Sequence, residues 1–156
     1  MNVLIDTSVW VGHFKQRNEH LVALLEGDSV VCHPYVVMEV ACGTPPNRRA
    51  IVPMLAELES APLATSDELL ELIERRSLYG RGCGLVDISL LASTLLSEKT
   101  LLWTADKRLE TLASEFHPVR GKPRGSARGR ERGQRSRPQG LLCSGAQLRS
   151  LWICIH

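Results

Sequence analysis

Apolar residues recur along the first 119 residues in two alternating patterns, which predict strands and helices in turn. Short runs rich in Val, Ile and Leu have the length of buried strands, whereas apolar side chains three or four positions apart have the spacing of helices. We expect strands at residues 2–5, 29–32, 61–65, 99–104 and 117–119. We expect helices at residues 9–13, 20–26, 34–43, 48–59, 66–73, 85–97 and 107–115. Such alternation is typical of an α/β sandwich, in which helices flank a short, mainly parallel central sheet.

Residues with known preferences for helix ends support several of these boundaries. Thr7 or Ser8 can cap the first helix, because their hydroxyl oxygens accept hydrogen bonds from free backbone N–H groups. Thr65 and Glu68 have the spacing of a capping box. The most apolar helix, at residues 85–97, would bury one stripe of side chains, at positions 85, 88, 91, 92, 95 and 96.

Four carboxylates stand at positions that are unusual for surface acids. Asp6 ends the first strand, and Asp106 stands where a later strand becomes a helix. Glu39 interrupts an apolar helix, and Asp87 lies in the first turn of the most apolar one. Helix capping or a helix N-terminus explains each aspartate taken alone, but neither explains Glu39. Taken together, four acids near the carboxyl ends of the strands predict one shared site.

Several carboxylates in one pocket repel one another, and a hard divalent cation removes that conflict. Mg²⁺ or Mn²⁺ takes oxygen ligands and can activate a water molecule for attack on a phosphodiester. Ser8 and Thr104 have hydroxyl groups two residues from an acid and are candidate partners of these ligands, although local turn bonds explain them equally well. Arg81, Lys107 and Arg108 lie near the acids and could meet phosphates, or they could be solvated surface charges.

The segments around these acids resemble the PIN-domain nucleases and, within them, the VapC-type toxins of bacterial toxin–antitoxin pairs. The matching segments are residues 3–10, Glu39 within its helix, residues 82–93 and residues 102–109. Their order and spacing fit the family over residues 1–119. The resemblance implies a compact α/β/α fold, a Mg²⁺ or Mn²⁺ site, and an endoribonuclease that hydrolyses RNA phosphodiester bonds.

Carried over residue by residue, the resemblance assigns the catalytic set to Asp6, Glu39, Asp87 and Asp106. The three aspartates would hold the cation, and the glutamate would be a further ligand or would position the attacking water. The resemblance also implies a homodimer and a small antitoxin protein whose C-terminal segment covers the site. Two alternatives stay open: a non-catalytic binding module of the same fold, and a Mg²⁺-dependent phosphatase with a nucleophilic Asp6. The phosphatase is the weaker alternative, because Ser8 stands where a second aspartate is usual.

Charge divides the chain into two parts. Through residue 119 there are 10 Lys and Arg against 16 Asp and Glu, a balance of −6. Residues 120–156 carry 9 basic residues and one acid, a balance of +8. We therefore expect a PIN-like nuclease domain at residues 1–119 and a disordered, basic, Arg- and Gly-rich extension at residues 120–156. Such an extension can bind nucleic acid through the phosphates, or can have no function of its own.

The remaining composition argues against several other classes of protein. The five cysteines are odd in number and show no C-x-x-C spacing, which argues against a disulfide framework or a thiolate zinc site. No apolar run reaches the roughly 18 residues of a membrane span, and the first residues lack the pattern of a signal peptide. We therefore expect a cytoplasmic protein that does not associate with membranes.

Overall fold

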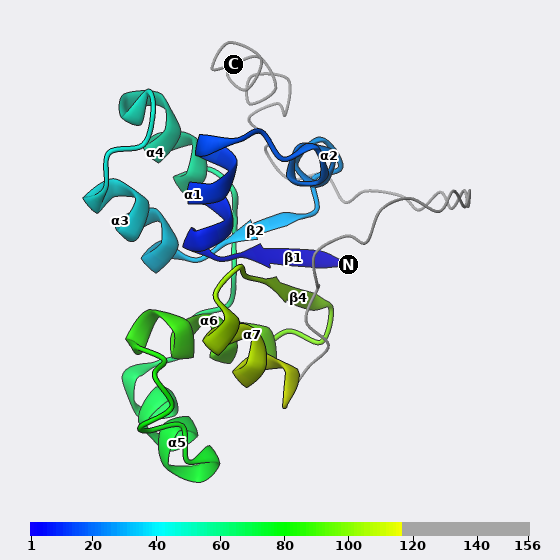
Figure 1. Ribbon diagram of the computed structural model, residues 1–156. Helices are drawn as coiled ribbons and strands as arrows, with labels where there is room; N and C mark the ends of the chain where they lie inside the picture. Colours follow the sequence, from blue (N-terminus) through cyan, green and yellow to red (C-terminus); the bar gives the residue numbers. More distant parts are fainter. Residues whose placement is uncertain (117–156) are drawn as a thin grey trace.

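A four-stranded parallel sheet forms the centre of the protein, with helices on two sides of it (Figure 1). The computed structural model describes residues 1–116. In chain order the elements are β1 (Asn2–Ile5), α1 (Thr7–Lys15), α2 (Glu19–Glu26), β2 (Val30–Cys32), α3 (Pro34–Cys42), α4 (Arg48–Ala56), β3 (Glu59–Ser60), α5 (Ser66–Arg76), α6 (Leu85–Leu95), β4 (Thr100–Trp103) and α7 (Lys107–Ser114). The predicted α/β fold with a parallel sheet is therefore confirmed.

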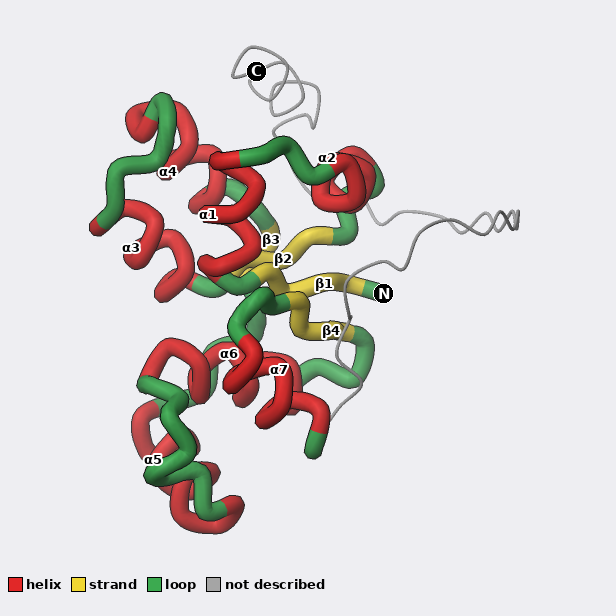
Figure 2. The backbone as a smooth tube through the Cα atoms, viewed as in Figure 1, coloured by secondary structure: helices red, strands yellow, loops and turns green. Residues whose placement is uncertain are grey.

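The order of the strands reverses beside β1. The sheet has the order β3-β2-β1-β4, and every neighbouring pair is parallel. From β1 the chain moves outward through β2 to β3, and it then returns to add β4 on the other side of β1. Helices α1 to α4 gather on one side of the sheet and α5 to α7 on the other (Figures 1 and 2). The carboxyl ends of β1 and β4 therefore flank the point of reversal, which is where open α/β sheets bind ligands.

The central strand β1 is buried along most of its length. Val3, Leu4 and Ile5 are completely buried, as expected for a parallel strand that is covered on both faces. Trp10 of α1 and Leu91 of α6 are also completely buried and pack in the same core. Burying a large apolar side chain contributes about 1.5–3 kcal/mol. This core fixes the position of β1 and of the acid that follows it.

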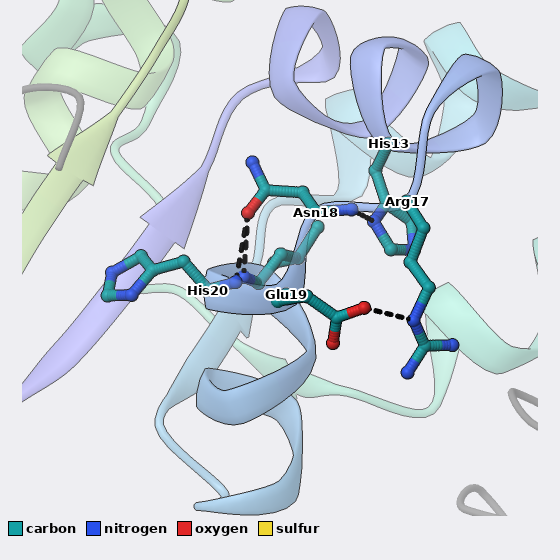
Figure 3. A network of polar contacts seen from close by, with 6 residues as sticks. His13, Arg17, Asn18, Glu19 and His20 are labelled. Carbon is teal, nitrogen blue, oxygen red and sulfur yellow. Dashed lines mark hydrogen bonds and ion pairs between the residues drawn. The ribbon is translucent and has the colours of Figure 1, made fainter. Parts of the chain in front are cut away.

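The polar turn between α1 and α2 is held by capping bonds (Figure 3). The side-chain oxygen of Asn18 accepts hydrogen bonds from the backbone N–H groups of His20 and Leu21 at 3.0 and 3.2 Å. The backbone N–H of Asn18 donates to Nδ1 of the buried His13 at 3.0 Å. These bonds satisfy N–H groups that the first turn of α2 leaves free. A polar break in the sequence thus becomes an ordered turn.

The prediction of a strand at residues 61–65 is wrong, because β3 ends earlier. Only Ala61 continues the pairing of β3, and its N–H donates to the carbonyl of Cys32 at 3.0 Å. Pro62 follows, and because proline has no N–H it cannot extend the ladder. The next residues lead to Thr65, which caps α5.

Helix α6 is buried on more sides than its apolar stripe predicted. Leu85 and Leu96 were expected in the core, but they lie at the ends of the helix and are 61% and 52% exposed. Ser89, Ser93 and Thr94 are buried instead. Their hydroxyl groups donate to backbone carbonyls of the same helix at 2.7, 3.0 and 2.7 Å, which satisfies these polar groups inside the core.

One of the predicted helix caps differs from the structure and one is confirmed. The cap of α1 is Asp6, whose side chain accepts the backbone N–H of Ser8, rather than Thr7 or Ser8 itself. The capping box of α5 is present as predicted, with bonds in both directions between Thr65 and Glu68.

Two predicted segments lie outside the described residues: the edge strand at 117–119 and the basic extension at 120–156. Within residues 1–116 no helix has the length and apolar character that a membrane span requires.

Candidate active site

Two of the four predicted acids lie at the carboxyl ends of neighbouring strands. Asp6 directly follows β1, and its backbone N–H donates to the carbonyl of Trp103 at 2.9 Å, which extends the pairing of β1 with β4. Asp106 follows β4 by three residues and caps α7. Both acids therefore lie at the reversal of strand order.

Asp6 is almost completely buried, and hydroxyl groups hold its carboxylate. Only 5% of the residue is exposed. Its Oδ2 atom accepts hydrogen bonds from the hydroxyl of Ser8, from the hydroxyl of Thr104 at 2.8 Å, and from the backbone N–H of Ser8 at 3.3 Å. No hydrogen bond from the described residues reaches Oδ1. Ser8 and Thr104 thus orient the carboxylate, offset the cost of burying it, and leave one oxygen for a ligand.

The same two hydroxyl groups connect Asp6 to the segment that carries Asp106. The oxygen of Ser8 accepts the backbone N–H of Ala105 at 2.9 Å. The oxygen of Thr104 accepts the backbone N–H of Asp106 at 2.9 Å. Each hydroxyl therefore donates to one strand end and accepts from the other, so a single network fixes the two strand ends together.

Asp106 is exposed and uses one carboxylate oxygen as a helix cap. Its Oδ1 atom accepts the backbone N–H groups of Arg108 at 2.7 Å and Leu109 at 3.3 Å. Its Oδ2 atom accepts no hydrogen bond from the part of the chain that the structure describes. The capping role considered from the sequence is present, and it leaves the second oxygen available.

Asp87 lies partly buried in the first turn of α6, where its charge is disfavoured. Burial raises the pKa of its carboxyl, and the neighbouring carboxylates of Asp6 and Asp106 raise it further. The backbone N–H of Gly84 acts in the opposite direction, because it donates to Oδ2 of Asp87 at 2.8 Å. The three aspartates therefore lie close enough for their charges to interact.

Glu39 does not interrupt a buried face, as the sequence suggested, but lies on the exposed side of α3. That helix buries Val36 and Val40 instead. The hydroxyl of Thr7, at the start of α1, donates to Oε2 of Glu39 at 2.5 Å. Because Thr7 is the neighbour of Asp6, this bond links α3 to the end of β1. The sequence pattern suggested only a capping role for Thr7, because this contact arises from the packing of α1 against α3.

The chemistry of the free aspartate oxygens, although not their present spacing, suits a hard divalent cation. Asp6, Asp87 and Asp106 each keep one carboxylate oxygen free of hydrogen bonds from residues 1–116. None of the three forms an ion pair within that range. As they stand, no three His, Cys, Asp or Glu side chains of the described chain are grouped closely enough to hold a metal ion. The donor set itself, mutually repelling oxygens without cationic partners, is the kind that Mg²⁺ and Mn²⁺ take.

Of the basic residues expected near the acids, Arg81 already has a partner. Its guanidinium donates two hydrogen bonds to the carboxylate of Glu115, one of them at 2.8 Å. Lys107 and Arg108 form no ion pair with any described residue. All three basic side chains line a cavity of about 320 Å³ beside α7.

A second cavity, of about 500 Å³, borders Glu39 and has mainly apolar walls. Tyr35 and Met38 of α3 and Leu85 and Val86 of α6 contribute to it. The acids therefore lie near two hollows of different character, a basic one beside α7 and an apolar one between α3 and α6.

Comparison with known proteins gives a consistent result over the whole described region. The pattern of the PIN domain matches residues 3–115. Two proteins of Mycobacterium tuberculosis, from strains CDC 1551 / Oshkosh and ATCC 25618 / H37Rv, are each 44% identical to this chain over 113 residues. The aligned part covers 72% of this chain and 91% of each relative, and both relatives carry the name Ribonuclease VapC32.

Proposed function

Because this chain belongs to the PIN-domain family and is a VapC-type nuclease, we propose that it is a toxin that cleaves RNA with Mg²⁺ or Mn²⁺ at a four-carboxylate site. The observation that carries this proposal is the electrostatic cluster of Asp6, Asp87 and Asp106. Burial and the carboxylates of Asp6 and Asp106 raise the pKa of Asp87, and each of the three aspartates keeps one carboxylate oxygen without a hydrogen bond from residues 1–116. Bound cation would offset the repulsion, which gives the three side chains one common reason for their positions.

In the proposed mechanism the protein orients groups rather than reacting covalently. A divalent cation, once bound by the three aspartates, would supply an activated water and stabilise the leaving oxygen of the phosphodiester. Ser8 and Thr104 hold Asp6 in one orientation, so its free oxygen is preorganised for a ligand. Thr7 holds Glu39 at one carboxylate oxygen, and the exposed glutamate is suited to position the attacking water.

The proposal extends to the partners of the protein. RNA is the substrate, and a small cognate antitoxin would cover the acidic site and inhibit cleavage. We also propose a homodimer, and a cytoplasmic location in which the RNA substrate is available. The name of the relatives, Ribonuclease VapC32, supports RNA as the substrate class.

Replacing Asp6 with asparagine tests the proposal directly. Asparagine keeps the size of the side chain and its ability to cap α1, so the fold should be preserved. It removes one of the charges that would hold the cation. We expect Asp6→Asn to reduce cleavage of cellular RNA in Mn²⁺ by at least about 100-fold, as loss of a group acting on the transition state does. Calorimetric titration of Mn²⁺ should show a correspondingly weaker site.

The matched control is Asp28→Asn, because Asp28 is an exposed acid in the turn after α2 with φ of 49°. Asparagine is well tolerated in that conformation. The control should cleave RNA and bind Mn²⁺ as the unchanged protein does. If Asp6→Asn cleaved RNA at the rate of the control, or if the unchanged protein bound no divalent cation, the proposal would be wrong.

A further inference from the structure

We propose that the basic cavity beside α7 binds a phosphate of the RNA strand adjacent to the one that is cleaved, through Lys107 and Arg108. This inference rests on the proposed function, because it assumes that an RNA strand passes over the acids. It assigns a separate substrate-binding role to residues that are not part of the acidic set.

The cavity is large enough for a phosphate group, and four of its five lining residues have charged or polar side chains. It has a volume of about 320 Å³, and its walls are formed by Arg81, Lys107, Arg108, Thr111 and Leu112. Leu112 is only 1% exposed and belongs to the core, so it gives this side of the cavity a fixed wall. The hydroxyl of Thr111 donates to the carbonyl of Lys107 at 2.7 Å, which leaves the cationic groups as the main ligands for an anion.

The positive charge of the cavity comes from two of its three basic residues. Glu115 neutralises Arg81 through two hydrogen bonds to the guanidinium. Lys107 and Arg108 have no acidic partner at ion-pair distance within residues 1–116. An anion entering the cavity therefore meets two uncompensated cations. A guanidinium and an ammonium group are the usual protein ligands of phosphate.

Arg108 is positioned by the glycine-rich loop before α6. A Cβ atom added to Gly82 would lie 3.2 Å from Cδ of Arg108 and 3.4 Å from its Nη1 atom. Gly82 also has φ of +78°, which side chains other than glycine rarely adopt. The absence of a side chain at Gly82 thus lets the loop backbone pack against the arginine. Such packing lowers the entropy that Arg108 would lose on binding a phosphate.

The basic cavity lies directly beside the acidic site. The backbone N–H of Arg108 donates to Oδ1 of Asp106, so one residue borders the cavity while its main chain binds a site acid. The thiol of Cys83 is affected by the charges of both the site acids and the basic residues of the cavity. Burial raises the pKa of its thiol, Asp87 and Asp106 raise it further, and Arg81 and Arg108 lower it.

This arrangement of charges suits a polynucleotide better than an isolated anion. A strand bound with one phosphate at the carboxylates has its next phosphate one nucleotide away, where acidic residues would repel it and basic residues would hold it. The basic cavity that Arg108 lines, next to Asp106, matches that requirement. An acidic peptide would also be attracted by the cations, and the experiment below is designed to distinguish it from RNA.

The test measures RNA binding apart from cleavage in the full chain. Arg108→Gln and Lys107→Gln are made in the Asp6→Asn background, and the binding of a single-stranded RNA is followed by fluorescence anisotropy at several salt concentrations. We expect roughly tenfold weaker binding for Arg108→Gln and about threefold for Lys107→Gln. The slope of log affinity against log salt should fall by about 0.7 for the phosphate contact that is lost. In the otherwise unchanged protein, KM should rise by a similar factor while kcat changes by less than about twofold.

The matched controls are Arg49→Gln and Lys15→Gln, which remove the same charges from exposed positions on α4 and α1. The controls should leave RNA binding, the salt slope and KM unchanged. If Arg108→Gln and Lys107→Gln behaved like these controls while the unchanged protein still cleaved RNA, the phosphate site would be refuted and the proposed function would stand. If the unchanged protein cleaved no RNA but both substitutions weakened RNA binding, the phosphate site would stand and the cleavage proposal would fall. Weakened binding of polyglutamate with unaltered RNA binding would identify a peptide site instead and would also refute the inference.

Discussion

At Asp87, burial and two neighbouring carboxylates oppose ionisation of the side chain. Because its pKa is higher in the folded protein than in the unfolded chain, the folded protein holds the proton more tightly. The free energy of unfolding therefore declines as pH rises from the unfolded pKa through the folded pKa, and the loss is complete above that range. A cation bound at the site would remove this penalty, so stability and metal binding are linked through Asp87.

We expect Asp87→Asn to stabilise the metal-free protein at neutral pH. Asparagine removes the disfavoured charge and can still accept the N–H of Gly84 through its side-chain oxygen. Thermal unfolding in EDTA should show a Tm about 2–4 °C higher, the change that ~1 kcal/mol produces in a chain of this size. Adding Mn²⁺ should raise the Tm of the unchanged protein more than that of the variant. A variant less stable than the unchanged protein in EDTA would show that the carboxylate is needed for folding instead.

Not all residues of the site could be predicted equally well from the sequence. Asp6 and its hydroxyl partners, Ser8 and Thr104, stand at strand ends that the apolar pattern locates, so local spacing was enough to suggest them. The role of Thr7 could not be predicted, because its bond to Glu39 spans 32 positions and depends on how α1 packs against α3. The exposure of Glu39 was also missed, because α3 is apolar on more than its buried side and the sequence does not show which side faces solvent.

At the scale of elements, most helix starts were easier to predict than helix ends or the short strand β3: the helix expected at 48–59 ends at Ala56, before β3. Capping residues act locally, and the box between Thr65 and Glu68 therefore defined the start of α5 correctly. The end of β3 depends on its pairing with β2 and on the absence of an N–H at Pro62, neither of which an apolar pattern reveals. The burial of Ser89 and Ser93 in α6 depends on carbonyl acceptors, within the helix for Ser89 and also at Pro62 for Ser93, so a stripe of apolar positions underestimated the buried face.

We expect Thr65→Ala to destabilise the protein without affecting its chemistry. The hydroxyl of Thr65 accepts the backbone N–H of Glu68 at 3.3 Å, and removing such a cap costs about 1 kcal/mol. None of its hydrogen bonds reaches the carboxylates of the site, so RNA cleavage at 25 °C should be unchanged. Urea unfolding should show a lower midpoint with the same slope. The control is Ser66→Ala, one position further along the same exposed turn, which should unfold like the unchanged protein. Equal urea midpoints for the two variants would mean that the capping box adds nothing to stability.

At the scale of the whole molecule, the reversal of strand order places the site. The sequence predicts which segments are strands, but it does not show that β4 pairs with β1 rather than with β3. That pairing brings Asp106 and Thr104 beside Asp6, although about 100 residues separate them in the chain. The positions of the acids near strand ends suggested one shared site, and the resemblance to PIN-domain nucleases added the topology that brings these residues together.

The division of charge along the chain leads to a prediction about RNA binding by the complete protein. Residues 1–119 have a balance of −6, which would disfavour RNA binding, whereas residues 120–156 have a balance of +8. We expect removal of residues 120–156 to weaken RNA binding and to leave kcat at saturating RNA unchanged, because the acids and hydroxyl groups of the site all lie before residue 107. The salt slope of binding should fall by about 0.7 for each phosphate contact that is lost.

The control for this truncation replaces residues 120–156 with a neutral Gly- and Ser-rich segment of equal length. If charge is the cause, the replacement and the truncation should bind RNA equally weakly, and their affinities should converge with that of the full chain as salt screens the phosphates. A replacement that bound RNA as tightly as the full chain would show that charge in this segment is irrelevant. A truncation that lowered kcat would show that the segment takes part in cleavage, so the acidic domain and its basic extension would have to be treated as one functional unit.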